Sequence, residues 1–163
     1  MTASGGWLPP LVCLEDCNGN WTLYLNAVYG HFRNDFVKSC PSVEGRRCGI
    51  MRTPITDGKE ATFWHIISEG KIESERVPDL RRCERIRWPR PIIEAMGSTR
   101  VCCWRRDAGQ PRILLALPDF SYLVVLKDLG NYVLLLTAYC VEPGHHRRKL
   151  AKECADYTMP RKG

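Results

Sequence analysis

The sequence predicts an α+β domain in which N-terminal helices precede a four-stranded antiparallel meander sheet and a C-terminal helix follows it. Two observations predict this fold: four β-like runs in the second half of the chain are joined by short turns, and helix-like segments lie before and after them. The 163 residues suffice for one domain with a substantial core. We expect that domain over residues 19–157, after a flexible Gly- and Pro-containing segment at 1–18 and before a tail at 158–163.

The first helix is expected from about residue 20 to Lys38. Asn18 or Asn20 can cap its N-terminus, and Pro41 helps to end it. Its apolar residues recur at spacings of three and four, which is the period of an amphipathic helix: Trp21, Leu25, Val28, Phe32 and Phe36.

The next segment, residues 40–60, contains several Pro and Gly residues and is expected to form a loop with room for a short strand near Ile50. The run from Ala61 to Ile67 is apolar, with His65 inside it, and Gly70 ends it. So short a run does not let periodicity separate a strand from a short helix, and both interpretations stay open.

Three further helices are expected. Pro78 suits the first turn of a helix that continues to about Ile86. A shorter helix over 91–96 ends at Gly97, a suitable C-cap. The last helix covers 145–157 and has a buried stripe of Leu150, Cys154 and Tyr157.

The β-like runs are separated by turns so short that consecutive strands must be antiparallel neighbours. The third and fourth runs are apolar on both faces, which predicts that they are central strands covered by helices on at least one side. The four runs are Val101–Arg105, Arg112–Leu117, Ser121–Lys127 and Tyr132–Val141.

Composition favours a polyanionic partner. The formal net charge is +6, the basic residues lie almost entirely after position 45, and arginine outnumbers lysine. Guanidinium groups bind phosphate in a bidentate manner, so arginine enrichment points to phosphate more than to solubility alone. Nine cysteines, an odd number, and the lack of a signal-peptide pattern indicate free thiols in a reducing cytoplasm. No apolar run approaches the roughly 20 residues of a membrane span.

His65 is the first candidate for chemistry. It is flanked by Phe63, Trp64 and Ile66, so we expect its imidazole to be partly withdrawn from water. An imidazole titrates near neutral pH and can accept or donate a proton during a reaction. The alternative is a core histidine that makes a buried hydrogen bond.

The second candidate is the arginine-rich segment 81–90. If residues 79–86 are helical, Arg81 and Arg85 share one face and Arg82 lies beside it. Clustered like charges are unfavourable unless an anion such as a phosphate backbone opposes them. Arg87 adds to the cluster, and Trp88 could stack on a base. A solvated basic face is the alternative.

Two further groups are candidates for a binding site. Alternation along a strand places Thr137 and Tyr139 on one face, where two hydroxyls can orient a phosphate or a nucleophile. The alternative is that both are ordinary strand residues with good β propensity. At the start of the last helix, His145, Arg147 and Arg148 could bind a polyanion, whereas His146 fits a solvated charge run. The cysteine spacings do not suit zinc, and no phosphate-binding glycine loop is present, so we expect neither a metal nor a cofactor.

Several linked blocks of the sequence resemble the phage- and prophage-encoded branch of the barnase–EndoU–colicin–RelE nuclease superfamily. The resemblance spans roughly residues 20–157. The blocks that carry it are Phe63-Trp64-His65-Ile66-Ile67, the segment 78–94, the segment 119–126, and Leu136-Thr137-Ala138-Tyr139 before a basic helix.

This resemblance implies RNA cleavage on the sheet face by attack of a 2′-hydroxyl on the adjacent phosphate, without a metal. By position, His65 would be the acid or base, an arginine among Arg81, Arg82 and Arg85 would stabilise the phosphorane, and Thr137 and Tyr139 would complete the site. The expected substrate is tRNA or mRNA in the cytoplasm of a bacterial host, and the protein would be a toxin-like effector, with an antitoxin or immunity protein as a further partner. The alternatives are a non-enzymatic module that binds RNA or a host protein, and a nucleotide-modifying enzyme on the same scaffold.

Overall fold

The architecture is α+β, but its sheet has six strands and is mixed, not four-stranded and antiparallel as we predicted. A computed structural model describes residues 6–70, 72 and 75–158 of the chain. The strand order is β1 (Ser42–Val43), β2 (Arg46–Gly49), β8 (Val133–Cys140), β7 (Tyr122–Asp128), β6 (Arg112–Ala116) and β5 (Cys102–Arg106).

The four strands that the sequence pattern identified form consecutive antiparallel pairs, from β5 to β8. The difference arises from the hairpin of β1 and β2. β2 pairs parallel with β8 through Cys48–Val133 and Gly49–Leu134. So few residues contribute to this contact that no alternation in the sequence marks it, which is why the strand near Ile50 was expected to stay within a loop.

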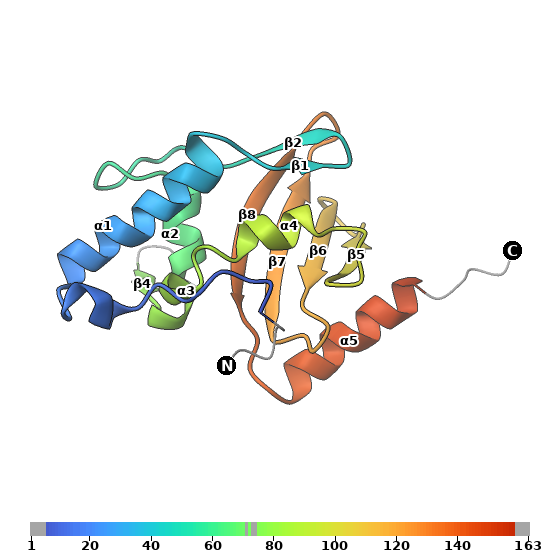
Figure 1. Cartoon of the computed structure of the whole chain (residues 1–163). Helices are drawn as coiled ribbons and strands as arrows, with labels where there is room; N and C mark the ends of the chain where they lie inside the picture. Colours follow the sequence, from blue (N-terminus) through green and yellow to red (C-terminus); the bar gives the residue numbers. More distant parts are fainter. Residues whose placement is uncertain (1–5, 71, 73–74, 159–163) are drawn as a thin grey trace, which may run out of the picture.

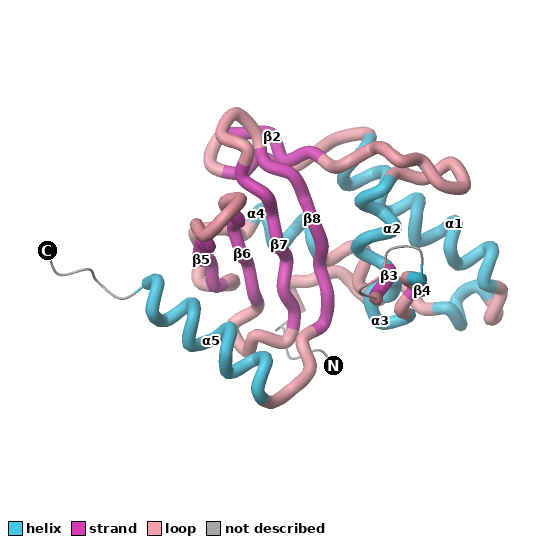
Figure 2. The backbone as a smooth tube through the Cα atoms, turned by 180° about the vertical axis from the view of Figure 1, so that it is seen from behind, coloured by secondary structure: helices cyan, strands magenta, loops and turns pink. Residues whose placement is uncertain are grey.

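Helices cover the two faces of the sheet unequally (Figure 1). One face carries the main core, where α1 (Trp21–Phe32), α2 (Ala61–Ile67), α3 (Leu80–Glu84) and α4 (Pro89–Glu94) supply buried side chains. The other face carries a smaller core with α5 (His145–Thr158), and Figure 2 shows α5 crossing only the lower end of that face. None of the helices in the described ranges is both long and apolar enough to cross a membrane.

The first helix begins where its N-cap predicts. The Asn20 side chain accepts a hydrogen bond from Leu23 N at 3.1 Å, which satisfies one of the free donors of the first turn. Tyr24, Val28 and Phe32 form its buried face, and a π-helical turn, η2 (Arg33–Val37), continues it. Trp21, expected on the apolar face, is 40% exposed.

The ambiguous run at 61–67 is helical, and this determines where His65 lies. Phe63, Ile66 and Ile67 are buried at helical spacing, whereas His65 is half-buried on another face of α2. The helix is followed by a small ladder between β3 (Ser68–Glu69) and β4 (Val77–Pro78). Asp79 then caps α3 by accepting from Arg81 N at 3.0 Å.

Residues 6–18, part of the segment expected to be a flexible lead-in, contact the helices. Leu8 is buried, and a short 3₁₀ helix, η1, spans Leu14–Cys17. The Trp88 indole donates to Pro9 O at 3.0 Å and the Tyr24 hydroxyl donates to Val12 O at 2.8 Å. These two hydrogen bonds and the burial of Leu8 therefore attach residues 6–18 to the helices. Residues 1–5 and 159–163 lie outside the described residues.

Candidate active site

A cavity of about 380 Å³ lies where α2 and α3 meet strand β8. It brings together four of the residues that the sequence singled out, and these come from three distant stretches of chain. Figure 1 shows α2 beside β8, below the point where β2 joins that strand. The lining residues are Met51, Thr62, His65, Arg76, Arg82, Leu136, Thr137 and Tyr139.

A β-bulge in β8 places the two hydroxyl residues in this cavity. Adjacent residues of β7 pair with Leu135 and Thr137, so Leu136 has no opposite residue. Leu135 faces the main core. In a regular strand Thr137 and Tyr139 would face that core as well, because side chains alternate. The extra residue moves both to the other face, where they line the cavity.

Two arginines hold the C-terminal end of α2. Arg76 Nη2 donates to His65 O at 3.0 Å and to Ser68 O at 2.6 Å. Arg82 Nη1 donates to the same two oxygens at 3.2 and 2.7 Å. Carbonyls at a helix end lack partners within the helix, so they are natural acceptors. The two guanidinium groups are therefore held close together, beside His65.

These carbonyl partners do not neutralise the two arginines. The one carboxylate near Arg82 in the described ion pairs is that of Asp79, 3.8 Å from Arg82 Nε. Burial and the neighbouring charge of Arg76 lower the pKa of Arg82, whose side chain is 12% exposed. The buried Arg76 Nε has no hydrogen-bond partner among the described residues. An anion in the cavity would offset this excess positive charge.

Tyr139 contacts groups from two other elements. The Arg82 guanidinium lies 5.2 Å from the centre of its ring, and the His146 ring is stacked at 6.3 Å between centroids. Burial raises the pKa of Tyr139, although Arg106 and Arg82 oppose this. The hydroxyl therefore keeps its proton at neutral pH and can donate it. His146, expected in a solvated charge run, is exposed, and it lies outside the cavity lining although its ring stacks on Tyr139.

The remaining arginines of segment 81–90 do not line the cavity, and Arg85, which we expected to be catalytic, is among them. Arg81 pairs with Glu142 at 2.6 Å. Arg85 donates to Arg81 O at 3.1 Å, and its guanidinium lies 5.1 Å from the Trp88 ring centre. Residues 81 and 85 share a helix face and residue 82 lies on another, so only Arg82 faces the cavity.

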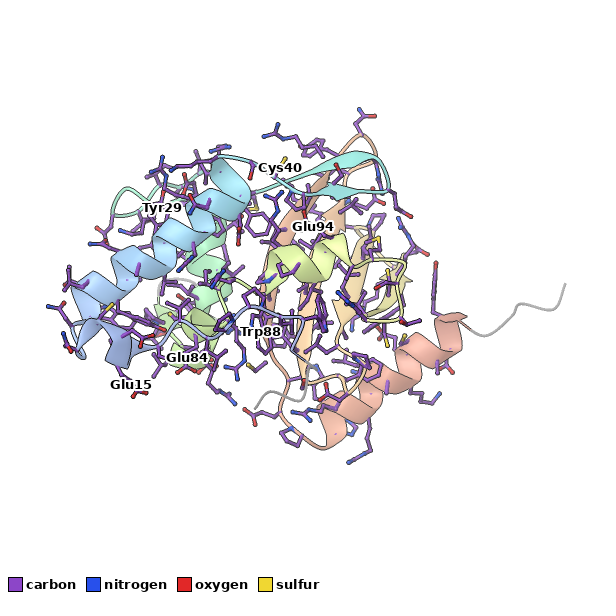
Figure 3. The ribbon with its side chains drawn as sticks, viewed as in Figure 1. Glu15, Tyr29, Cys40, Glu84, Trp88 and Glu94 are labelled. Atoms are coloured by element: carbon purple, nitrogen blue, oxygen red, sulfur yellow. The ribbon has the colours of Figure 1, made fainter. Side chains whose placement is uncertain are left out.

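Trp88 was expected to stack on a base, but it belongs to the core. It is 5% exposed and packs edge-on against Tyr122 at 5.2 Å between centroids. Figure 3 shows Trp88 near the middle of the molecule, where the N-terminal segment passes. Arg87 faces α1 instead, where burial and the Arg87 charge lower the pKa of His31.

The basic residues at the start of α5 lie outside the cavity lining. His145 and Arg148 are exposed, and Arg147 Nε donates to Val141 O at 2.9 Å. Conversely, sequence reasoning missed Arg76, Thr62 and Met51. Thr62 Oγ1 accepts from Met51 N at 2.7 Å, which ties α2 to the segment after β2. No local pattern distinguishes Arg76 from a surface arginine.

In the ranges that the structure describes, His, Cys, Asp and Glu form no group of three or more that could hold a metal ion. Comparison of the chain with protein-family models, with curated proteins and with solved structures found no match. The geometry of the cavity is therefore the basis of the function proposed below.

Proposed function

We propose that this protein is a metal-independent endoribonuclease that cleaves RNA by attack of a 2′-hydroxyl on the adjacent phosphate. The observation that carries the proposal is the convergence of His65, two arginines and two hydroxyl side chains around one cavity. This set contains a proton acceptor, cations for the phosphate oxygens and hydroxyl donors. The sequence resemblance to the barnase–EndoU–colicin–RelE nucleases supports the same chemistry.

In the proposed reaction His65 accepts the proton of the 2′-hydroxyl, and that oxygen forms a bond to phosphorus. The bond from phosphorus to the 5′-oxygen breaks, and the Tyr139 hydroxyl protonates the leaving oxygen. Arg76 and Arg82 stabilise charge on the non-bridging oxygens, and Thr137 donates a hydrogen bond to them. The products are a 2′,3′-cyclic phosphate and a 5′-hydroxyl end, and one proton passes from His65 to Tyr139 to restore the starting state.

A row of basic side chains on the same sheet face supports a polymeric substrate. Arg106 pairs with Arg112, and Arg112 with Lys127, across three adjacent strands. Arg106 is bonded to Glu153 at 2.7 Å, but Arg112 and Lys127 form no ion pair with another described residue. Like charges directly opposite are unfavourable, and a phosphate backbone would offset them. Thr137 lies on this face, which Figure 2 displays.

The decisive test is cleavage of total RNA in the presence of a chelator. Wild type should produce fragments with 2′,3′-cyclic phosphate ends, and His65→Ala should be about 10²–10⁴ times slower. His31→Ala is the matched control, because His31 lies on α1 and does not line the cavity. Intact RNA after incubation with wild type, or equal rates for His65→Ala and wild type, would refute the proposal.

Expression in a bacterial host tests the toxin-like role. If the enzyme acts on cellular tRNA or mRNA, wild type should arrest growth, and His65→Ala should relieve the arrest. A protein that only binds RNA would bind with steep salt dependence and leave it intact. Growth arrest that His65→Ala does not relieve would favour such a binding module.

A further inference from the structure

A second cavity, of about 210 Å³, adjoins the first. The two share His65 and Arg76 as lining residues, so these side chains form the wall between them. The second cavity has apolar surfaces and hydroxyl groups but only the shared arginine as a fixed cation. Its lining residues are Pro54, Thr56, Ala61, Trp64, His65, Ser68 and Arg76.

We propose that this second cavity binds one nucleobase flanking the scissile phosphate, with the base stacked on Trp64. The identity of the ligand as part of RNA rests on the function proposed above. Sites for drug-sized ligands usually enclose roughly 300–1,000 Å³, so the smaller volume suits a single planar base rather than a whole nucleotide. Continuity with the first cavity lets one chain place its phosphate by Arg82 and its base by Trp64.

The Trp64 indole is held in place without a ligand. Its Nε1 donates to Thr56 O at 3.0 Å, and its ring packs edge-on against Phe63 at 5.4 Å between centroids. Thr56 itself is fixed by two backbone hydrogen bonds with Lys59, each 3.0 Å long. A base that stacks on this ring therefore need not order it first, which lowers the entropic cost of binding.

The polar groups of the cavity suit the edge of a base. The hydroxyls of Thr56 and Ser68 can each donate or accept, so they can pair with either kind of edge group. Stacking on an aromatic side chain works for every base, because each base has a π-face. The cavity thus offers binding strength through Trp64 and orientation through the hydroxyls.

The first experiment measures kcat/KM for a dinucleotide and for two analogues that each lack one base. With wild type, removal of one of the two bases should lower kcat/KM about 10–100-fold, the usual scale of one stacked base. Trp64→Leu should lower kcat/KM for the intact dinucleotide by a similar factor. With this variant, the analogue that lacks the stacked base should have the same kcat/KM as the intact dinucleotide. Trp21→Leu, a change at a 40% exposed tryptophan on α1, should alter neither value.

If wild type cleaves both abasic analogues as fast as the dinucleotide, the proposed base site is refuted, but the proposed ribonuclease activity is not. These substrate comparisons need no variant, so they hold even if Trp64→Leu unfolds. Trp64→Phe, which keeps an aromatic ring, should retain activity to within a few-fold. Equal losses for Trp64→Phe and Trp64→Leu would assign Trp64 a purely structural role.

The second experiment does not require cleavage. Each of the four ribonucleoside monophosphates is titrated into wild type while the indole N–H signals are followed by NMR, with Trp64 assigned from Trp64→Phe. At least one of them should shift the Trp64 signal and leave the Trp21 signal in place. No shift of the Trp64 signal with any of the four would refute the base site, whether or not the protein cleaves RNA.

Discussion

Two pairs of arginines in this molecule are bonded to different kinds of acceptor. Near one end of the sheet, Arg46 and Arg105 both bind the Asp128 carboxylate, with an Arg46–Asp128 distance of 2.6 Å. Beside β8, Arg76 and Arg82 instead share two backbone carbonyls. Both pairs are oriented by hydrogen bonds, but the first has two carboxylates, Asp128 and Glu44, for its two charges, whereas the second has only the more distant Asp79 among the described ion pairs.

The acceptor decides what each pair can do. The hydrogen bond from Arg46 is the main reason why the pKa of Asp128 is held well below its usual range. Its charge is therefore present at neutral pH. Together with the Glu44 carboxylate, 2.9 Å from Arg46 and 3.6 Å from Arg105, it offsets the charges of the two arginines. A backbone carbonyl orients a guanidinium group without cancelling its charge, so Arg76 and Arg82 keep the capacity to attract an anion. The first pair stabilises the fold, and the second is available for a ligand.

Within this comparison, the largest effect is expected from matched changes in the two arginine pairs. Arg82→Met should lower kcat/KM for RNA cleavage about 10²–10³-fold, because a cation for the phosphate oxygens is lost. Arg105→Met should change it by less than about threefold, since that charge is already neutralised. Arg82→Lys keeps the positive charge but lacks the planar guanidinium group that binds phosphate in a bidentate manner, so it should recover part of the lost kcat/KM. Equal effects of Arg82→Met and Arg105→Met on kcat/KM would contradict the distinction between the carboxylate-bound and the carbonyl-bound arginine pairs.

Tyr139, whose ring contacts Arg82, should give the next largest effect. Tyr139→Phe should lower kcat by on the order of 10²-fold, because the leaving oxygen loses its proton donor. Because the pKa of Tyr139 is raised above its ordinary value near 10, wild-type kcat should show no alkaline decline up to about pH 9.5. Tyr132→Phe, at a 44% exposed tyrosine, is the control. A decline centred below pH 9 would contradict the assigned role.

The carboxylate-bound pair should affect stability and not cleavage. Asp128→Asn should lower the Tm by roughly 2–6 °C at pH 7 and leave kcat/KM unchanged. A lowered folded-state pKa means that Asp128 stabilises the fold above its ordinary pKa near 4 and loses this effect as the pH falls. The difference in Tm between variant and wild type should therefore shrink below about pH 4 in melting curves. A constant difference down to pH 2.5 would contradict this origin.

The smallest effect is expected for Arg85, which lies outside the cavity lining and pairs with the Glu84 carboxylate at 3.6 Å. Arg85→Ala should change kcat/KM by less than about threefold, because Arg85 lies over Trp88 and outside the cavity lining. The measurement uses the same RNA substrate as the Arg82 variants. A loss as large as that of Arg82→Met would show that Arg85 enters the site when RNA binds.

Local sequence was sufficient for most of the elements. Turn residues and alternation located the four long strands, and Asn20 was one of the two caps expected for the first helix, because these signals depend on neighbours within a few residues. The same reasoning proposed His65, Arg82, Thr137 and Tyr139, all of which line the cavity. It also predicted that Thr137 and Tyr139 share a face, which alternation alone determines.

Only the tertiary structure decided which face that is, through the bulge at Leu136. The tertiary structure also determined that β2 pairs with β8 and that Trp88 is buried. It placed Arg82 and Arg76, but not Arg85, in the cavity lining. Each of these depends on contacts between residues far apart in the chain, and such contacts are set by packing and by which backbone groups remain unpaired. An arginine has the same local sequence signal whether it binds a carboxylate or a carbonyl, so its role follows from the acceptor that the fold provides.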